Sequence, residues 1–67
     1  MEKIKSFIEK FINENYEKGC NLDAYLNLIL DKLDNPDYAK EIGIPFDDFL
    51  SYYRGIPEKE KMKIIQK

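Results

Sequence analysis

The chain has 67 residues, 43% of them hydrophobic, which is enough for one small core and too little for a separate substrate domain or a deep cofactor cleft. Its net charge is −2 and its pI is about 5.0, whereas free DNA-binding modules are usually basic. The single cysteine excludes an internal disulfide and no apolar run approaches a membrane span, so we expect a cytoplasmic protein with no membrane partner.

The residue usage and spacing of the N-terminal half predict two helices. The chain lacks Val and Thr and is rich in Lys, Glu, Leu and Ile, which favours helices over strands. Apolar residues recur every three or four positions over about residues 2–18, and Gly19 is expected to close this first helix. A second helix is predicted at 22–33, with Asn21 as its N-cap. It is apolar on most sides, with Leu28 and Leu30 widening its buried stripe, so we expect it to be the central element.

Proline and glycine divide the C-terminal half into shorter helices. Asp34-Asn35-Pro36 ends the second helix and starts the next, and two Gly-Ile-Pro tripeptides each end one helix and open another. The three helices predicted in this half cover about residues 36–42, 46–54 and 57–66. We therefore expect an all-α, compact bundle of about five helices that forms a single domain over residues 1–67.

Residues 38–55 have the spacing of two helices that meet at a tight corner. Ala39 is small where the helices would cross, and Gly43 tolerates positive φ in the turn. The apolar side chains that would lock the corner are Ile42, Ile44, Phe49 and Tyr52. This stretch resembles helix-turn-helix proteins of the Cro and phage-repressor type, including the Arg54-Gly55 pair after the second helix. The resemblance implies a small DNA-associated regulatory protein that binds paired half-sites as a homodimer.

The residue types on the second helix of this corner differ from those of a DNA reader. Carried over from the family, the base-reading positions fall at Pro45, Phe46, Asp47, Leu50 and Ser51. Direct readout favours Arg, Lys, Asn or Gln, and Asp47 with Asp48 would repel phosphates. Phosphate contacts would instead come from basic residues that flank the corner, which also fit an ordinary solvated helix face. These residues are Lys40, Arg54, Lys59, Lys61 and Lys63.

The same helix suggests an alternative function as a protein-interaction module, either an adaptor or an inhibitor. Phe46, Leu50 and Tyr53 repeat at helical spacing and would lie partly outward, beside carboxylates, which suits a protein partner. A small core could equally use all three side chains.

Catalytic and metal-binding chemistry is not indicated. The chain has no His, and Cys20 has no neighbouring base that would activate it, so we expect no enzyme activity and no cofactor. The acids of residues 31–37 lack the glycine and glutamate of an EF-hand loop, so we expect no metal site.

Overall fold

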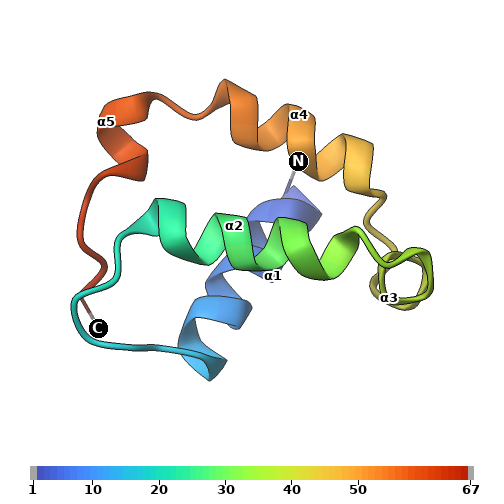
Figure 1. The fold of residues 1–67 in the computed structure, drawn as a ribbon, viewed down its shortest axis with the longest axis horizontal. Helices are drawn as coiled ribbons and strands as arrows, with labels where there is room; N and C mark the ends of the chain where they lie inside the picture. The colour runs from blue at the N-terminus through green and yellow to red at the C-terminus, as the bar shows by residue number, and fades with distance from the viewer. Residues whose placement is uncertain (1, 67) are drawn as a thin grey trace.

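The computed structural model describes residues 2–66 and has five helices in these residues, shown in Figure 1. They are α1 (Glu2–Glu14), α2 (Leu22–Leu33), α3 (Pro36–Ile42), α4 (Phe46–Gly55) and α5 (Glu58–Lys61). The described residues form no named strand, and their radius of gyration is 11.5 Å, against about 11 Å for a folded chain of this length. The predicted all-α, compact bundle of about five helices is confirmed.

Helix α2 is the central element, as predicted. It contacts each of the other helices, and its Tyr25, Leu26 and Ile29 are at most 1% exposed. Asn21 caps it by accepting a hydrogen bond from the backbone N–H of Ala24 at 2.9 Å. Helix α4 runs antiparallel to α2 on one side, while α1 crosses behind it (Figure 1). Leu28 was expected to widen the buried stripe of α2, but that prediction is wrong because it faces solvent and is 53% exposed.

Helix α1 is shorter than predicted. It ends at Glu14 instead of near residue 18, and Gly19 takes its positive φ of 92° in the connecting loop rather than at the helix end. The side-chain amide of Asn15 donates to the carbonyl of Phe11 and so terminates the helix. The buried Tyr25 hydroxyl then accepts from the N–H of Glu17 and donates to its carbonyl, at 2.9 and 3.1 Å. This pair of bonds holds the loop against α2 and replaces the extra helical turn.

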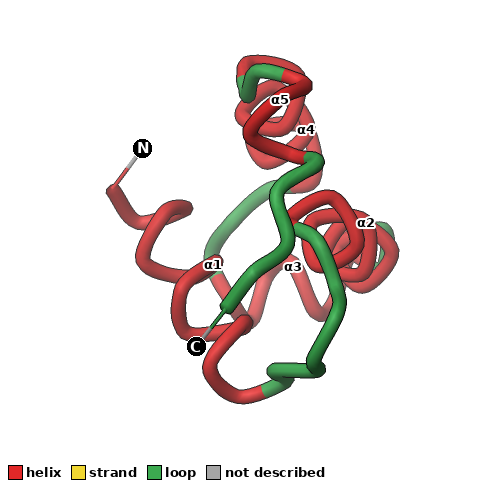
Figure 2. The backbone as a smooth tube through the Cα atoms, turned by 90° about the vertical axis from the view of Figure 1, so that its left-hand side faces the viewer, coloured by secondary structure: helices red, strands yellow, loops and turns green. Residues whose placement is uncertain are grey.

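The predicted helix 57–66 is only partly present. Helix α5 covers Glu58–Lys61, and the following residues pair with the start of α2 instead, as Figure 2 shows for the loop segments that run side by side. Leu22 N–H donates to the Lys63 carbonyl at 3.0 Å, and Ile65 N–H donates to the Cys20 carbonyl at 2.9 Å. Ile65, which this pairing holds next to Cys20, packs against the core.

The corner between α3 and α4 has the predicted bend. Gly43 ends α3 with φ of 83°, and the N–H groups of Gly43 and Ile44 both donate to the Ala39 carbonyl, at 2.8 and 3.2 Å. Ile44 and Phe49 are 2% and 0% exposed, so they anchor both sides of the turn in the core. The chain therefore changes direction sharply between two helices, with α3 seen nearly end-on in Figure 1 while α4 runs across the page.

No described helix could cross a membrane. The longest, α1, has 13 residues, whereas a membrane-spanning helix needs about 20 apolar ones.

Candidate interaction site at the helical corner

Helix α4 presents an exposed polar face on the side opposite its buried anchor. Phe49 points into the core. Because successive residues of a helix are rotated by about 100°, the residues two before, two after and five after Phe49 point away from the core. These residues are Asp47, Ser51 and Arg54, and all three are exposed. The structure therefore places three of the predicted contact residues together on one accessible helix face.

The row formed by Phe46, Leu50 and Tyr53 borders this face. All three side chains are half-buried. Phe46 and Tyr53 pack against the core, whereas Leu50 is not among the residues that do so. The row therefore serves the core and still offers part of its apolar surface to solvent.

Tyr53 connects three helices. Its hydroxyl donates a 2.7 Å hydrogen bond to Oδ1 of Asp23 in the first turn of α2. That hydrogen bond to a carboxylate, and then partial burial, raise the pKa of Tyr53 above its ordinary value. The Lys61 ammonium lies 4.3 Å from the centre of the Tyr53 ring and 3.7 Å from a carboxylate oxygen of Glu58, and its side chain is only 13% exposed. Two of the predicted contact residues, Tyr53 and Lys61, thus hold α2, α4 and α5 together.

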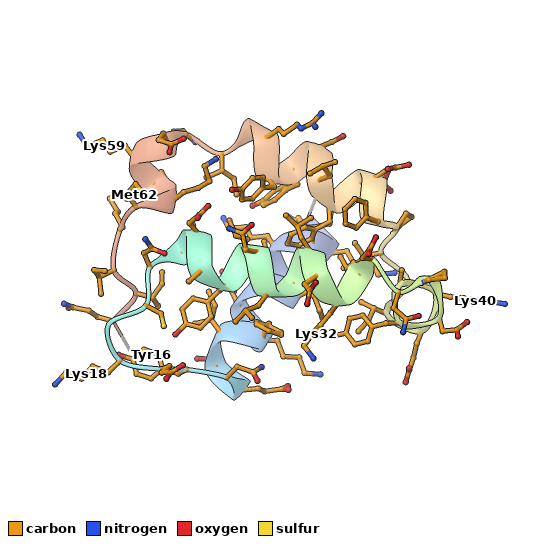
Figure 3. All side chains as sticks on the ribbon, in the orientation of Figure 1. Tyr16, Lys18, Lys32, Lys40, Lys59 and Met62 are labelled. Atoms are coloured by element: carbon orange, nitrogen blue, oxygen red, sulfur yellow. The ribbon has the colours of Figure 1, made fainter. Side chains whose placement is uncertain are left out.

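The predicted phosphate-binding lysines do not form one surface. Lys40 and Lys59 extend away from opposite ends of the molecule in Figure 3. Lys63 is exposed but pairs with Glu60 at 3.2 Å, and Lys61 lies over the tyrosine ring described above. A duplex lying along α4 would therefore meet these cations at separate places rather than as a continuous track.

Exposed carboxylates surround the corner instead. They come from the C-terminal end of α2, from α3 and from the first turn of α4, and all are exposed. Both ion pairs among the described residues lie within residues 58–63. None of the carboxylates around the corner therefore takes part in an ion pair among the described residues. They are Asp31, Asp34, Asp37, Glu41, Asp47 and Asp48. Of these acids, only those of α4 were predicted to lie at an interaction surface, because the sequence alone does not bring the end of α2 next to that helix.

A groove opens where the end of α2, helix α3 and the start of α4 meet. Its volume is about 460 Å³, and most of its lining is apolar. We call it the corner groove, and its lining residues are Leu33, Asp34, Pro36, Ala39, Lys40, Gly43, Pro45 and Phe46. The small and ring-closed side chains of the turn leave this space open. The groove was missed in the sequence, although two prolines, an alanine and a glycine within ten residues were a signal for it.

Comparisons with protein-family models, with curated proteins and with solved structures found no match to this chain. Within residues 2–66, no group of acidic or cysteine side chains is placed to hold a metal ion.

Proposed function

We propose that this chain is a small protein-interaction module, non-catalytic, which binds a basic protein partner through the exposed face of α4 and the neighbouring end of the bundle. The observation that carries the proposal is the excess of exposed, unpaired carboxylates around a helical corner. Carboxylates on a binding surface attract a cationic partner and speed its association. Cys20 is a free thiol, which supports a reducing compartment such as the cytoplasm.

Helix stability explains only some of these carboxylates. Asp47 and Asp48 lie in the first turn of α4, where the helix dipole favours a negative charge by about 0.3–1 kcal/mol each. Asp31 and Asp34 lie at the C-terminal end of α2, where the dipole disfavours a negative charge, but Asp34 also directly precedes the N-cap of α3, where a negative charge is favoured. Helix dipoles therefore leave Asp31 unexplained, and binding of a cationic partner is the better explanation for it.

Site-specific crosslinking tests the proposal. A photoreactive amino acid at the exposed Ser51 should form a covalent adduct with a partner protein in cell extract, whereas the same group at exposed Glu9 on α1 should not. The double variant Asp47→Lys/Asp48→Lys should abolish the Ser51 adduct. The control Glu9→Lys/Glu17→Lys, with the same change in net charge, should retain it. Identical adducts at Ser51 and Glu9, or an adduct that survives reversal at α4, would remove the proposal.

DNA-associated regulation is the second candidate. It is favoured by the corner itself, whose turn glycine and buried Phe49 match the resemblance to helix-turn-helix proteins. This candidate predicts binding of mixed-sequence duplex DNA at low salt by a homodimer, with affinity that falls as salt rises and as Lys40 and Arg54 are replaced by alanine. Fluorescence anisotropy and sedimentation equilibrium measure both properties. Failure to bind DNA at low salt excludes the candidate.

A further inference from the structure

We infer that the corner groove binds a large apolar side chain of a partner segment in which that side chain is flanked by Lys or Arg. The inference rests on the proposed interaction function and names the chemistry of the partner. A volume of about 460 Å³ lies within the range of about 300–1,000 Å³ found for binding pockets. Pro45 and Phe46 offer accessible apolar surface in the lining, beside Leu33, which is only 1% exposed, so the groove suits a hydrophobic side chain.

The charges in the lining and on neighbouring residues of the chain select the residues beside that side chain. Asp34 is part of the lining, Asp47 follows the lining residue Phe46 in the chain, and Asp31 and Asp37 lie three residues before and after Asp34. Lys32 is also close to Asp34 in the chain, but it is not part of the lining, and its ammonium lies 5.6 Å from the centre of the Tyr38 ring. These carboxylates are exposed and unpaired among the described residues. Lys40 is the one cation in the lining, and its side chain extends away from the body of the molecule (Figure 3). A segment with Lys or Arg beside its apolar anchor is therefore attracted, and an acidic segment is repelled.

The protein's own surfaces are poor occupants of this groove. Residues 62–66 lie at the other end of the bundle, where Ile64 pairs with Asn21. A second copy that presented the same face would place carboxylate against carboxylate, which costs free energy. A basic segment of a different protein fits the charge of this surface better than either alternative.

Peptide titration followed by NMR tests the inference without the natural partner. The ¹⁵N-labelled protein would be titrated with a short synthetic peptide of leucine and lysine. We expect saturable shifts of the amide resonances of Ala39, Gly43 and Phe46. A serine–lysine peptide should bind about tenfold or more weakly because it lacks the apolar anchor, and a leucine–glutamate peptide should cause no shift at these residues. Equal binding of the two lysine peptides would overturn the inference, because charge alone would then explain it.

Matched charge reversals locate the effect. Asp34→Lys should weaken the leucine–lysine peptide about tenfold or more, whereas Glu9→Lys, with the same change in net charge on exposed α1, should have a much smaller effect. Equal losses in the two variants, or shifts centred on another face, would overturn the inference. So would concentration-dependent shifts of the groove resonances in the protein alone, which would identify a second copy as the occupant.

The two hypotheses fail in different ways. A partner crosslinked at Ser51, with groove resonances that do not respond to the leucine–lysine peptide, overturns the groove inference alone. Saturable binding in the groove without any partner crosslinked at Ser51 overturns the proposed interaction through α4.

Discussion

Replacing Gly43 with alanine tests the bend between α3 and α4. Gly43 has φ of 83°, where an L-residue costs about 1–2 kcal/mol. An added Cβ would also lie 2.7 Å from Nζ of Lys3, but this atom ends a flexible, exposed side chain that can move aside. Alanine restricts the unfolded chain and returns about 0.4–1 kcal/mol. We therefore expect Gly43→Ala to lower the free energy of unfolding by about 1 kcal/mol.

That loss is measurable in a chain of this size. At about 0.05–0.15 kcal/mol per residue, 67 residues have a total stability of roughly 3–10 kcal/mol. For a domain this small, about 1 kcal/mol lowers the melting temperature by about 4–8 °C. Thermal and urea unfolding followed by circular dichroism would measure both quantities.

Gly55→Ala is the matched control. Gly55 is the last residue of α4, its φ is not positive, and beyond its chain neighbours and the backbone of its own helix no atom lies within 4 Å of the position of an added Cβ. The same chemical change should therefore raise stability by about 0.4–1 kcal/mol. A Gly43→Ala protein as stable as the parent, or two glycine variants that shift in the same direction, would refute the reasoning. If Lys3→Ala suppresses the Gly43→Ala effect, the cost is crowding and not backbone strain.

Three further predictions concern the contacts that connect the helices. Tyr53→Phe removes the bond to Asp23 and should lower stability by about 1 kcal/mol in urea titrations. The pKa of Tyr53 is raised in the folded protein, so the free energy that its hydroxyl contributes is present below about pH 10 and is lost as pH rises through that raised pKa. The difference in free energy of unfolding between Tyr53→Phe and the parent should shrink over the same pH range, and a difference that stays unchanged at higher pH would contradict this. Ile65→Asp should lower the melting temperature strongly and Ile64→Asp little, because of the two only Ile65 packs against the core; equal effects, whether large or small, would contradict this difference in packing. Asn21→Ala should cost about 1 kcal/mol in chemical denaturation, and no change would mean that the cap bond to Ala24 contributes nothing.

The interior helix boundaries were predictable because their signals are local. Asn21 and Asn35 cap the helices that follow them, and Gly43 ends α3, each through bonds to residues at most four positions away. The bounds of α2 and α3 match the prediction, and α4 differs by one residue at its C-terminal end. Short-range hydrogen bonds and backbone preferences can be recognised in a few adjacent letters.

The candidate site was predictable only where it depends on local helix periodicity. The periodicity around Phe49 is enough to place Asp47, Ser51 and Arg54 on the outer face of one helix. It does not show that Tyr53 bonds to Asp23, which lies 30 positions away in the chain. It also does not bring Asp34 next to Phe46 in one groove. These relations depend on how α2 packs against α3 and α4.

The amino-acid sequence by itself determined that this chain is helical, where its inner helices start and stop, and that α4 carries carboxylates outward. The tertiary structure alone decided where α1 and α5 end, because the Tyr25 hydroxyl binds the loop at Glu17 and Ile65 pairs with Cys20. It also decided that Lys40 and Lys59 lie at opposite ends of the molecule, and that the end of α2, helix α3 and the start of α4, with their exposed carboxylates, meet at one corner. The physical reason is range: helix propensity, capping and glycine conformation act within about one turn, whereas burial and charge depend on segments that only packing brings together.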